Sequence, residues 1–112
     1  MQRMARTRTD ALGPAVRPVA VPADFGAARA EASGHVELPL HVRWSGPVVT
    51  YDLSDRRDQA RVYEQVLREG TDEDVRFFVD PEGLLDVWDD LVLPPPVREA
   101  WANWVRRHRR VA

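Results

Sequence analysis

Apolar side chains recur every three or four residues from about residue 54 onward, and this spacing predicts short amphipathic helices. The first helix has Asp52 or Ser54 as its N-cap and ends at Gly70. The second is short and is capped by Thr71, and the acids in its first turn suit the positive end of the helix dipole. The inward-facing side chains of these two helices are Ala60, Tyr63, Val66, Leu67, Val75, Phe78 and Val79.

Prolines mark the starts of two further helices. Asp80 is an N-cap before Pro81 at the first helical position, and the helix that follows ends near Leu91. Residues 94–96 are all proline and interrupt the chain, but Pro96 is well placed to begin the fourth helix. The apolar positions of these two helices are Leu84, Leu85, Val87, Trp88, Leu91, Val97, Ala100, Trp101, Trp104, Val105 and His108. The fold is therefore predicted to be mainly α, a compact bundle of about four short helices.

Two short apolar segments precede the helices. Residues 36–44 and 48–53 contain β-branched and aromatic side chains and flank a Ser-Gly-Pro turn signal at 45–47. Pro39 and Pro47 each remove a backbone donor, so neither segment can be a long central strand. The sequence predicts a short β-ribbon or extended strap that lies across the helices.

Residues 1–34 have no sustained periodicity and contain several prolines and glycines. We expect a flexible or disordered arm there, outside a single small domain formed by residues 35–112. The alternatives are a weak helical turn over residues 23–32, or translation that starts later than the first methionine.

Charge is distributed unevenly along the chain. The net charge of −2 combines +3 in residues 1–30, −7 in residues 71–97 and +4 in residues 98–112 with small contributions elsewhere. Helix capping and a solvated face would explain the acidic block. The alternative is a docking surface for a partner with a basic surface. The residues predicted to bind a protein partner are Arg43 and Trp44 of the ribbon and the acids Asp74, Asp86, Asp89 and Asp90.

The last helix carries a cluster of arginines that could hold phosphates. The cluster consists of Arg106, Arg107, Arg109 and Arg110. Cations also stabilise the C-terminal end of a helix without any partner. The alternative function is therefore a small helical DNA-binding transcriptional regulator that uses these arginines.

The sequence offers little for catalysis. It has no cysteine, no glycine-rich phosphate loop, and its histidines at 35, 41 and 108 lack metal-ligand spacing. We therefore predict a protein that is not an enzyme and that uses no metal or cofactor. A small hydrolase or metal-dependent enzyme is the third class considered, and it would require a bound metal or a pocket of convergent polar groups. No long apolar stretch suggests a signal or membrane span, which predicts a cytoplasmic protein without membrane contact.

Four segments resemble a family of small bacterial proteins. They are residues 41–47 (HVRWSGP), 51–53 (YDL), 61–70 (RVYEQVLREG) and 85–94 (LDVWDDLVLP). They resemble the antitoxin-side proteins encoded beside AbiEii-type nucleotidyltransferase toxins, and the resemblance covers about residues 36–110. It implies a non-enzymatic antitoxin that binds and neutralises a nucleotidyltransferase, with regulation of its own operon as a second implication. The cleft of such a toxin should be basic, so the acidic helices would complement it.

Overall fold

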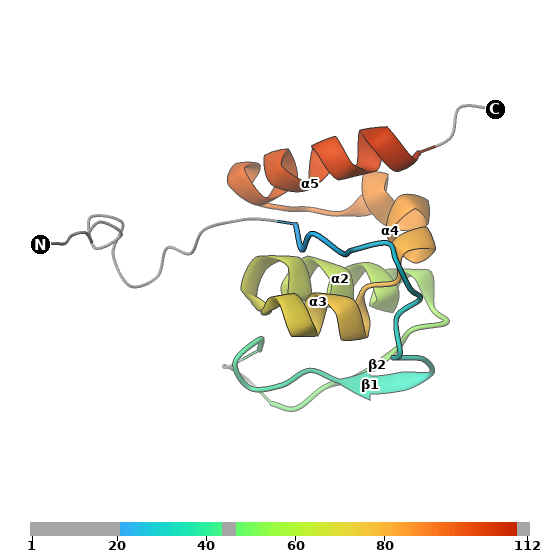
Figure 1. The fold of residues 1–112 in the computed structure, drawn as a ribbon. Helices are drawn as coiled ribbons and strands as arrows, with labels where there is room; N and C mark the ends of the chain where they lie inside the picture. Colours follow the sequence, from blue (N-terminus) through green and yellow to red (C-terminus); the bar gives the residue numbers. More distant parts are fainter. Residues whose placement is uncertain (1–20, 44–46, 110–112) are drawn as a thin grey trace, which may run out of the picture.

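The computed structural model describes residues 21–43 and 47–109. In this part of the chain a two-stranded antiparallel ribbon precedes four α-helices (Figure 1). The elements are β1 (His35–Glu37), β2 (Thr50–Asp52), α2 (Arg56–Glu69), α3 (Asp72–Phe78), α4 (Pro81–Val87), the 3-10 turn η2 (Trp88–Asp90) and α5 (Pro95–His108). The ribbon lies at one end of the molecule and α5 at the other, with α2 and α3 between them (Figure 1). The predicted mainly α fold with a preceding ribbon is confirmed.

Helix α2 begins one residue later than predicted. Asp55 is its N-cap, and its carboxylate accepts from the N–H groups of Arg57 and Asp58. Asp52 cannot take this role because its carboxylate accepts from both the N–H and the hydroxyl of Ser54. The predicted end at Gly70 is confirmed.

The remaining helix starts follow local signals in the sequence. Thr71 forms a capping box with Asp74, and Asp80 caps α4 by accepting from the N–H of Gly83. Helix α4 ends at Val87, and η2 carries the helical turn on to Leu91, near the predicted end. Helix α5 begins at Pro95 rather than at the predicted residue 96.

The four helices enclose one apolar core. Its most deeply buried side chains are Val62, Val66, Val79, Leu84, Val87 and Trp101. Trp88 and Trp104 are also buried, whereas Trp44 lies outside the described residues. Three of the four tryptophans are therefore core residues, as the sequence predicted for most of them.

The predicted domain boundary at residue 34 differs from the structure. Residues 21–34 run between α5 and the α2–α3 pair before they reach β1 (Figure 1), and Phe25 is only 7% exposed. Its ring packs edge-on against Trp101 and Trp104, with centroids 4.9 Å and 4.7 Å away. The Trp104 indole N–H also donates to the Phe25 carbonyl. Residues 21–34 therefore belong to the packed domain, and residues 1–20 of the predicted arm lie outside the described residues.

Asp80 fixes the second half of the same segment. Its carboxylate accepts from the Arg29 guanidinium at 2.8 Å and from the Ala30 N–H at 3.0 Å. Partial burial tends to raise the pKa of Asp80, but these bonds and the one from the Gly83 N–H outweigh burial and lower the pKa below its usual range. One carboxylate thus caps α4 and holds residues 29–30.

Candidate partner-binding surface

The turn of the ribbon is joined to the start of α3 by a histidine–carboxylate contact. His41 Nε2 lies 2.6 Å from Asp74 Oδ2. The same Asp74 oxygen accepts from the Thr71 N–H, and the Asp74 side chain is only 14% exposed. Burial tends to raise the pKa of Asp74, but the bonds from Thr71 and His41 outweigh it and lower this pKa. Asp74, which the sequence predicts to bind a partner, joins the ribbon turn to the start of α3.

Arg43 also acts inside the ribbon. Its Nε donates to the Tyr51 hydroxyl at 3.1 Å, and its Nη1 donates to the Pro47 carbonyl at 2.7 Å. Gln65 of α2 donates to the same hydroxyl at 3.0 Å. Half-buried Arg43 therefore closes the ribbon turn, and the shared Tyr51 hydroxyl connects this turn to α2. Trp44 is the other ribbon residue predicted to bind a partner, and it lies outside the described residues.

Two exposed aliphatic side chains flank this closed turn. Leu40 is 76% exposed and Val48 is 77% exposed. The acids Asp72 and Glu73 are exposed on the first turn of α3, next to the His41–Asp74 contact. Neither acid has an ion-pair partner among residues 21–43 and 47–109. We call Leu40, Val48, Asp72 and Glu73 the ribbon-turn surface.

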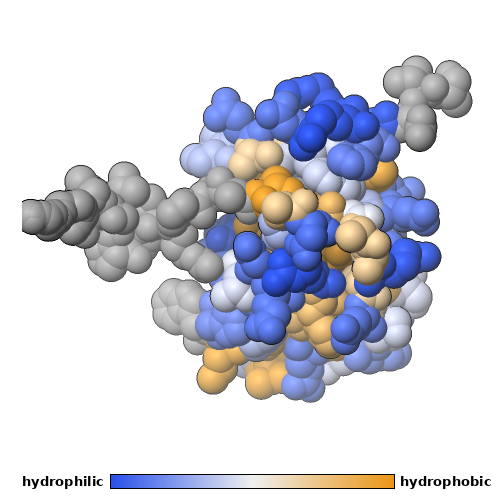
Figure 2. All heavy atoms as spheres, in the orientation of Figure 1, coloured by the Kyte–Doolittle hydropathy of each residue, from blue (hydrophilic) through white to orange (hydrophobic). Residues whose placement is uncertain are grey.

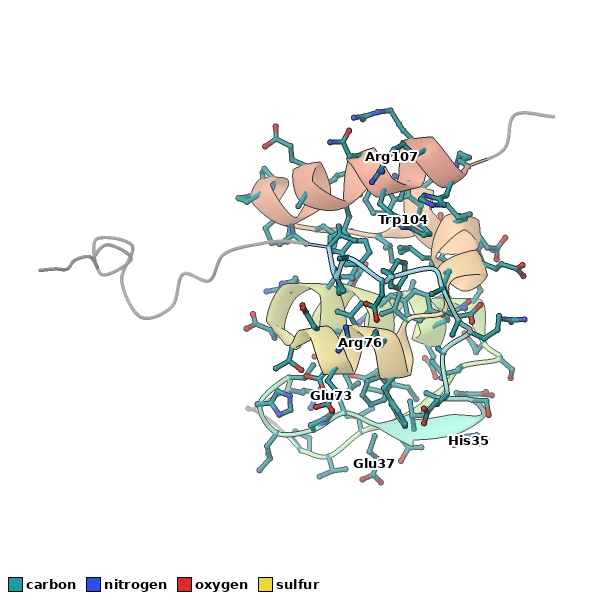
Figure 3. The ribbon with its side chains drawn as sticks, in the orientation of Figure 1. His35, Glu37, Glu73, Arg76, Trp104 and Arg107 are labelled. Carbon is teal, nitrogen blue, oxygen red and sulfur yellow. The ribbon has the colours of Figure 1, made fainter. Side chains whose placement is uncertain are left out.

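A hollow of about 640 Å³ adjoins the ribbon-turn surface. Pro39 and Glu73 lie at its border with that surface, and Phe77, which is 43% exposed, forms part of its apolar wall. Arg76 and Asp24 line it too and are paired at 3.1 Å. Glu73 and Arg76 project from α3 in Figure 3, and Figure 2 shows hydrophobic and hydrophilic residues side by side at the ribbon end of the molecule.

The three aspartates of α4 and η2 lie elsewhere and are paired with arginines. Arg56 of α2 contacts Asp86 at 2.8 Å and Asp90 at 2.9 Å, and it also donates to the Asp86 carbonyl. Arg109 lies 3.6 Å from Asp89. The acidic block predicted as one docking face is therefore divided, because the three aspartates of α4 and η2 share two arginines.

The C-terminal arginines also have unequal environments. Arg109 is engaged by Asp89 and by the Leu85 carbonyl, and Arg110 lies outside the described residues. Arg106 and Arg107 are exposed and contact the side chain and the carbonyl of Asn103. Of the four arginines predicted to bind phosphate, these two have no acidic partner in the described part of the chain.

Leu40 and Val48 were not singled out from the sequence. Each directly follows a proline, Pro39 or Pro47, and this position in a turn was the available signal. Pattern alone cannot separate an exposed aliphatic side chain in a turn from one that covers the core.

Within the described ranges, no group of three or more histidine, aspartate or glutamate side chains is arranged to hold a metal ion. The helices described here are also too short or too polar to span a membrane. No family model matches this chain, and no curated protein or solved structure has significant similarity to it.

Proposed function

We propose that this chain is a protein-binding module that recognises its partner through the ribbon-turn surface. The observation that carries the proposal is the pair of almost fully exposed aliphatic side chains, Leu40 and Val48, beside two carboxylates, Asp72 and Glu73, with no ion-pair partner among the described residues. Single exposed aliphatic residues are common on protein surfaces. Two in one closed turn, next to a hollow with an apolar wall, are typical of an interface.

The chemistry of this surface defines the kind of partner. Burying an aliphatic side chain the size of Leu40 or Val48 stabilises a complex by about 1.5–3 kcal/mol. Asp72 and Glu73 favour a basic surface at the rim of the contact, where charge guides the encounter and the choice of partner. The adjoining hollow has room for a side chain of that partner, with Phe77 as a contact.

The resemblance to antitoxins beside nucleotidyltransferase toxins narrows the partner further. A nucleotidyltransferase binds a triphosphate, so its cleft needs basic groups. A module that presents carboxylates beside apolar side chains would dock over such a cleft and exclude the substrate. Neutralisation of a nucleotidyltransferase toxin is therefore the specific form of the proposal.

Binding to the protein encoded by the adjacent reading frame tests the proposal. We expect a complex with a micromolar or tighter Kd by calorimetry, and we expect Leu40→Glu to raise that Kd about tenfold or more because it removes about 1.4 kcal/mol or more. Val92→Glu is the matched control, since Val92 is also 77% exposed but lies between η2 and α5. No complex at micromolar concentrations, or equal losses for the two variants, would contradict the proposal.

A DNA-binding regulator is the second candidate, and Arg106 and Arg107 are the observation that favours it. Both are exposed and neither has an acidic partner among the residues described. This function predicts duplex binding that weakens steeply with salt and is lost when both arginines are replaced by alanine. Unchanged binding by that double variant would count against it.

A further inference from the structure

The outer edge of β1 carries backbone groups that have no hydrogen-bond partner among the described residues. The Leu53 N–H donates to the Gly34 carbonyl at 2.8 Å, and the register pairs Val36 with Tyr51. In an antiparallel ladder, alternate residues point their backbone groups toward the neighbouring strand. Gly34 and Val36 therefore face β2, while the N–H and C=O groups of His35 and Glu37 face away from it. In the described ranges, these groups accept and donate no hydrogen bond.

The outer edge of β2 is closed at Asp52, in contrast. The outward N–H of Asp52 donates to the Asp58 carboxylate at 2.9 Å, and the outward Asp52 carbonyl accepts from the Asp55 N–H at 2.9 Å. The start of α2 thus occupies the position that another strand would need. Protein sheets usually protect their edges in this way, because an open edge invites pairing. The ribbon therefore has an edge that is protected at Asp52 and, among the described residues, an open edge along β1.

We propose that β1 pairs with β1 of a second copy of this chain, antiparallel and centred on Val36. A twofold axis at this position places His35 of each copy opposite Glu37 of the other. These are the residues whose backbone groups face outward, so they form the hydrogen-bonded pairs, with about four bonds across the interface. The product is a continuous four-stranded sheet, with the order β2, β1, β1 and β2.

The side chains of β1 fit this register and argue for a second copy as the occupant. His35 and Glu37 are exposed on the outer face of the ribbon, and each would lie opposite a complementary group. On the inner face Val36 would lie beside Val36, a β-branched pair at the closer, non-hydrogen-bonded spacing. Leu38 would lie opposite Gly34, where nothing comes within 4 Å of an added Cβ. The strand is thus complementary to itself in side-chain size and in hydrogen-bonding groups. Figure 3 shows His35 and Glu37 at the end of the molecule opposite α5.

Single-cysteine variants of the full chain test the register directly, because the native chain has no cysteine. Only residue 36 meets itself in this arrangement, at a Cα separation of about 4.5 Å that a disulfide can bridge. We expect Val36→Cys to form a covalent dimer readily under mild oxidation, while Glu37→Cys forms far less by itself. Glu37→Cys mixed with His35→Cys should cross-link to a heterodimer. Equal cross-linking of Val36→Cys and Glu37→Cys, or none at all, would overturn the proposed register.

Sedimentation of the purified protein tests the association without a cross-link. We expect a concentration-dependent dimer that His35→Lys tightens severalfold, since lysine would face Glu37, and that His35→Glu weakens severalfold. Glu37→Pro removes only an outward N–H, so it should abolish the dimer while the far-ultraviolet spectrum stays helical. Glu82→Lys on α4 is the charge control and should leave association unchanged. A protein that stays monomeric at hundreds of micromolar would refute self-pairing, and so would pairing of this edge with another protein only.

Discussion

Replacing Phe25 with alanine tests whether residues 21–34 are an integral part of the domain. The Phe25 side chain is 7% exposed and is held edge-on between Trp101 and Trp104. Truncating a buried phenylalanine to alanine costs about 3–5 kcal/mol, from lost burial and from the cavity that it leaves. The backbone contacts of Phe25 and the bonds to Asp80 stay in place, and residues 21–34 can also relax outward. We therefore expect the free energy of unfolding to fall by about 3 kcal/mol, near the lower limit of this range.

The measurement is urea unfolding followed by tryptophan fluorescence. A domain of this size has a total stability of about 5 kcal/mol or slightly more, so Phe25→Ala should keep about 2 kcal/mol and stay folded in water. With a slope near 1 kcal/mol per molar, the midpoint should fall by about 3 M urea. The emission of the folded state should also shift to longer wavelength, because water reaches Trp101 and Trp104.

Phe77→Ala is the matched control for this experiment. Phe77 packs edge-on against Phe78 but is 43% exposed, so its truncation should cost only about 1 kcal/mol. A loss below about 1 kcal/mol for Phe25→Ala, or a loss no larger than that of Phe77→Ala, would refute the view that residues 21–34 complete the core.

Two further variants probe the same segment. Asp80→Asn keeps an oxygen that can cap α4 but removes the ion pair with Arg29, and we expect a loss of about 1 kcal/mol at neutral pH because that pair is solvent-screened. The folded-state pKa of Asp80 is lowered, so ionised Asp80 stabilises the fold above the usual aspartate range, and this stabilisation is lost as the pH falls below about 4. The difference in free energy of unfolding between the native chain and the variant should therefore vanish in acid. A difference that stays constant down to pH 2 would contradict this. Gly26→Ala should cost about 1–2 kcal/mol in thermal unfolding, because φ is +102° and an added Cβ would lie 3.2 Å from the Trp104 ring. Gly34→Ala, at φ +69° with nothing within 4 Å, should cost less, and the reverse order would show that the Trp104 contact is unimportant.

The electrostatics of the domain have a consequence for any partner. Arg56 pairs with Asp86 and Asp90, and Arg109 pairs with Asp89, so all three aspartates of α4 and η2 take part in ion pairs. Exposed pairs of this kind contribute little to stability. Within residues 71–97, Asp72, Glu73 and Glu82 are the exposed acids without an ion-pair partner among the described residues.

Local sequence signals place most of the helix ends. Local signals act within about one helical turn: Thr71 and Asp80 accept hydrogen bonds from nearby N–H groups, Pro81 has a restricted φ, and the Gly70 N–H donates to the Val66 carbonyl. Such signals depend little on residues that are distant in the sequence. The error at the start of α2 also came from local competition, since Asp52 is bound to Ser54.

Which side chains are exposed and which are buried or paired depends on the tertiary structure. Phe25 is the one aromatic residue in the first 34, and nothing near it in sequence indicates the two tryptophans, 76 and 79 positions later, that bury it. The pairing of Arg56 with acids about 30 residues away, the contact of His41 with Asp74 and the open edge of β1 are decided in the same way. Charge and hydrophobicity are properties of a residue type, whereas the exposure and pairing of a side chain depend on the residues that the fold places beside it.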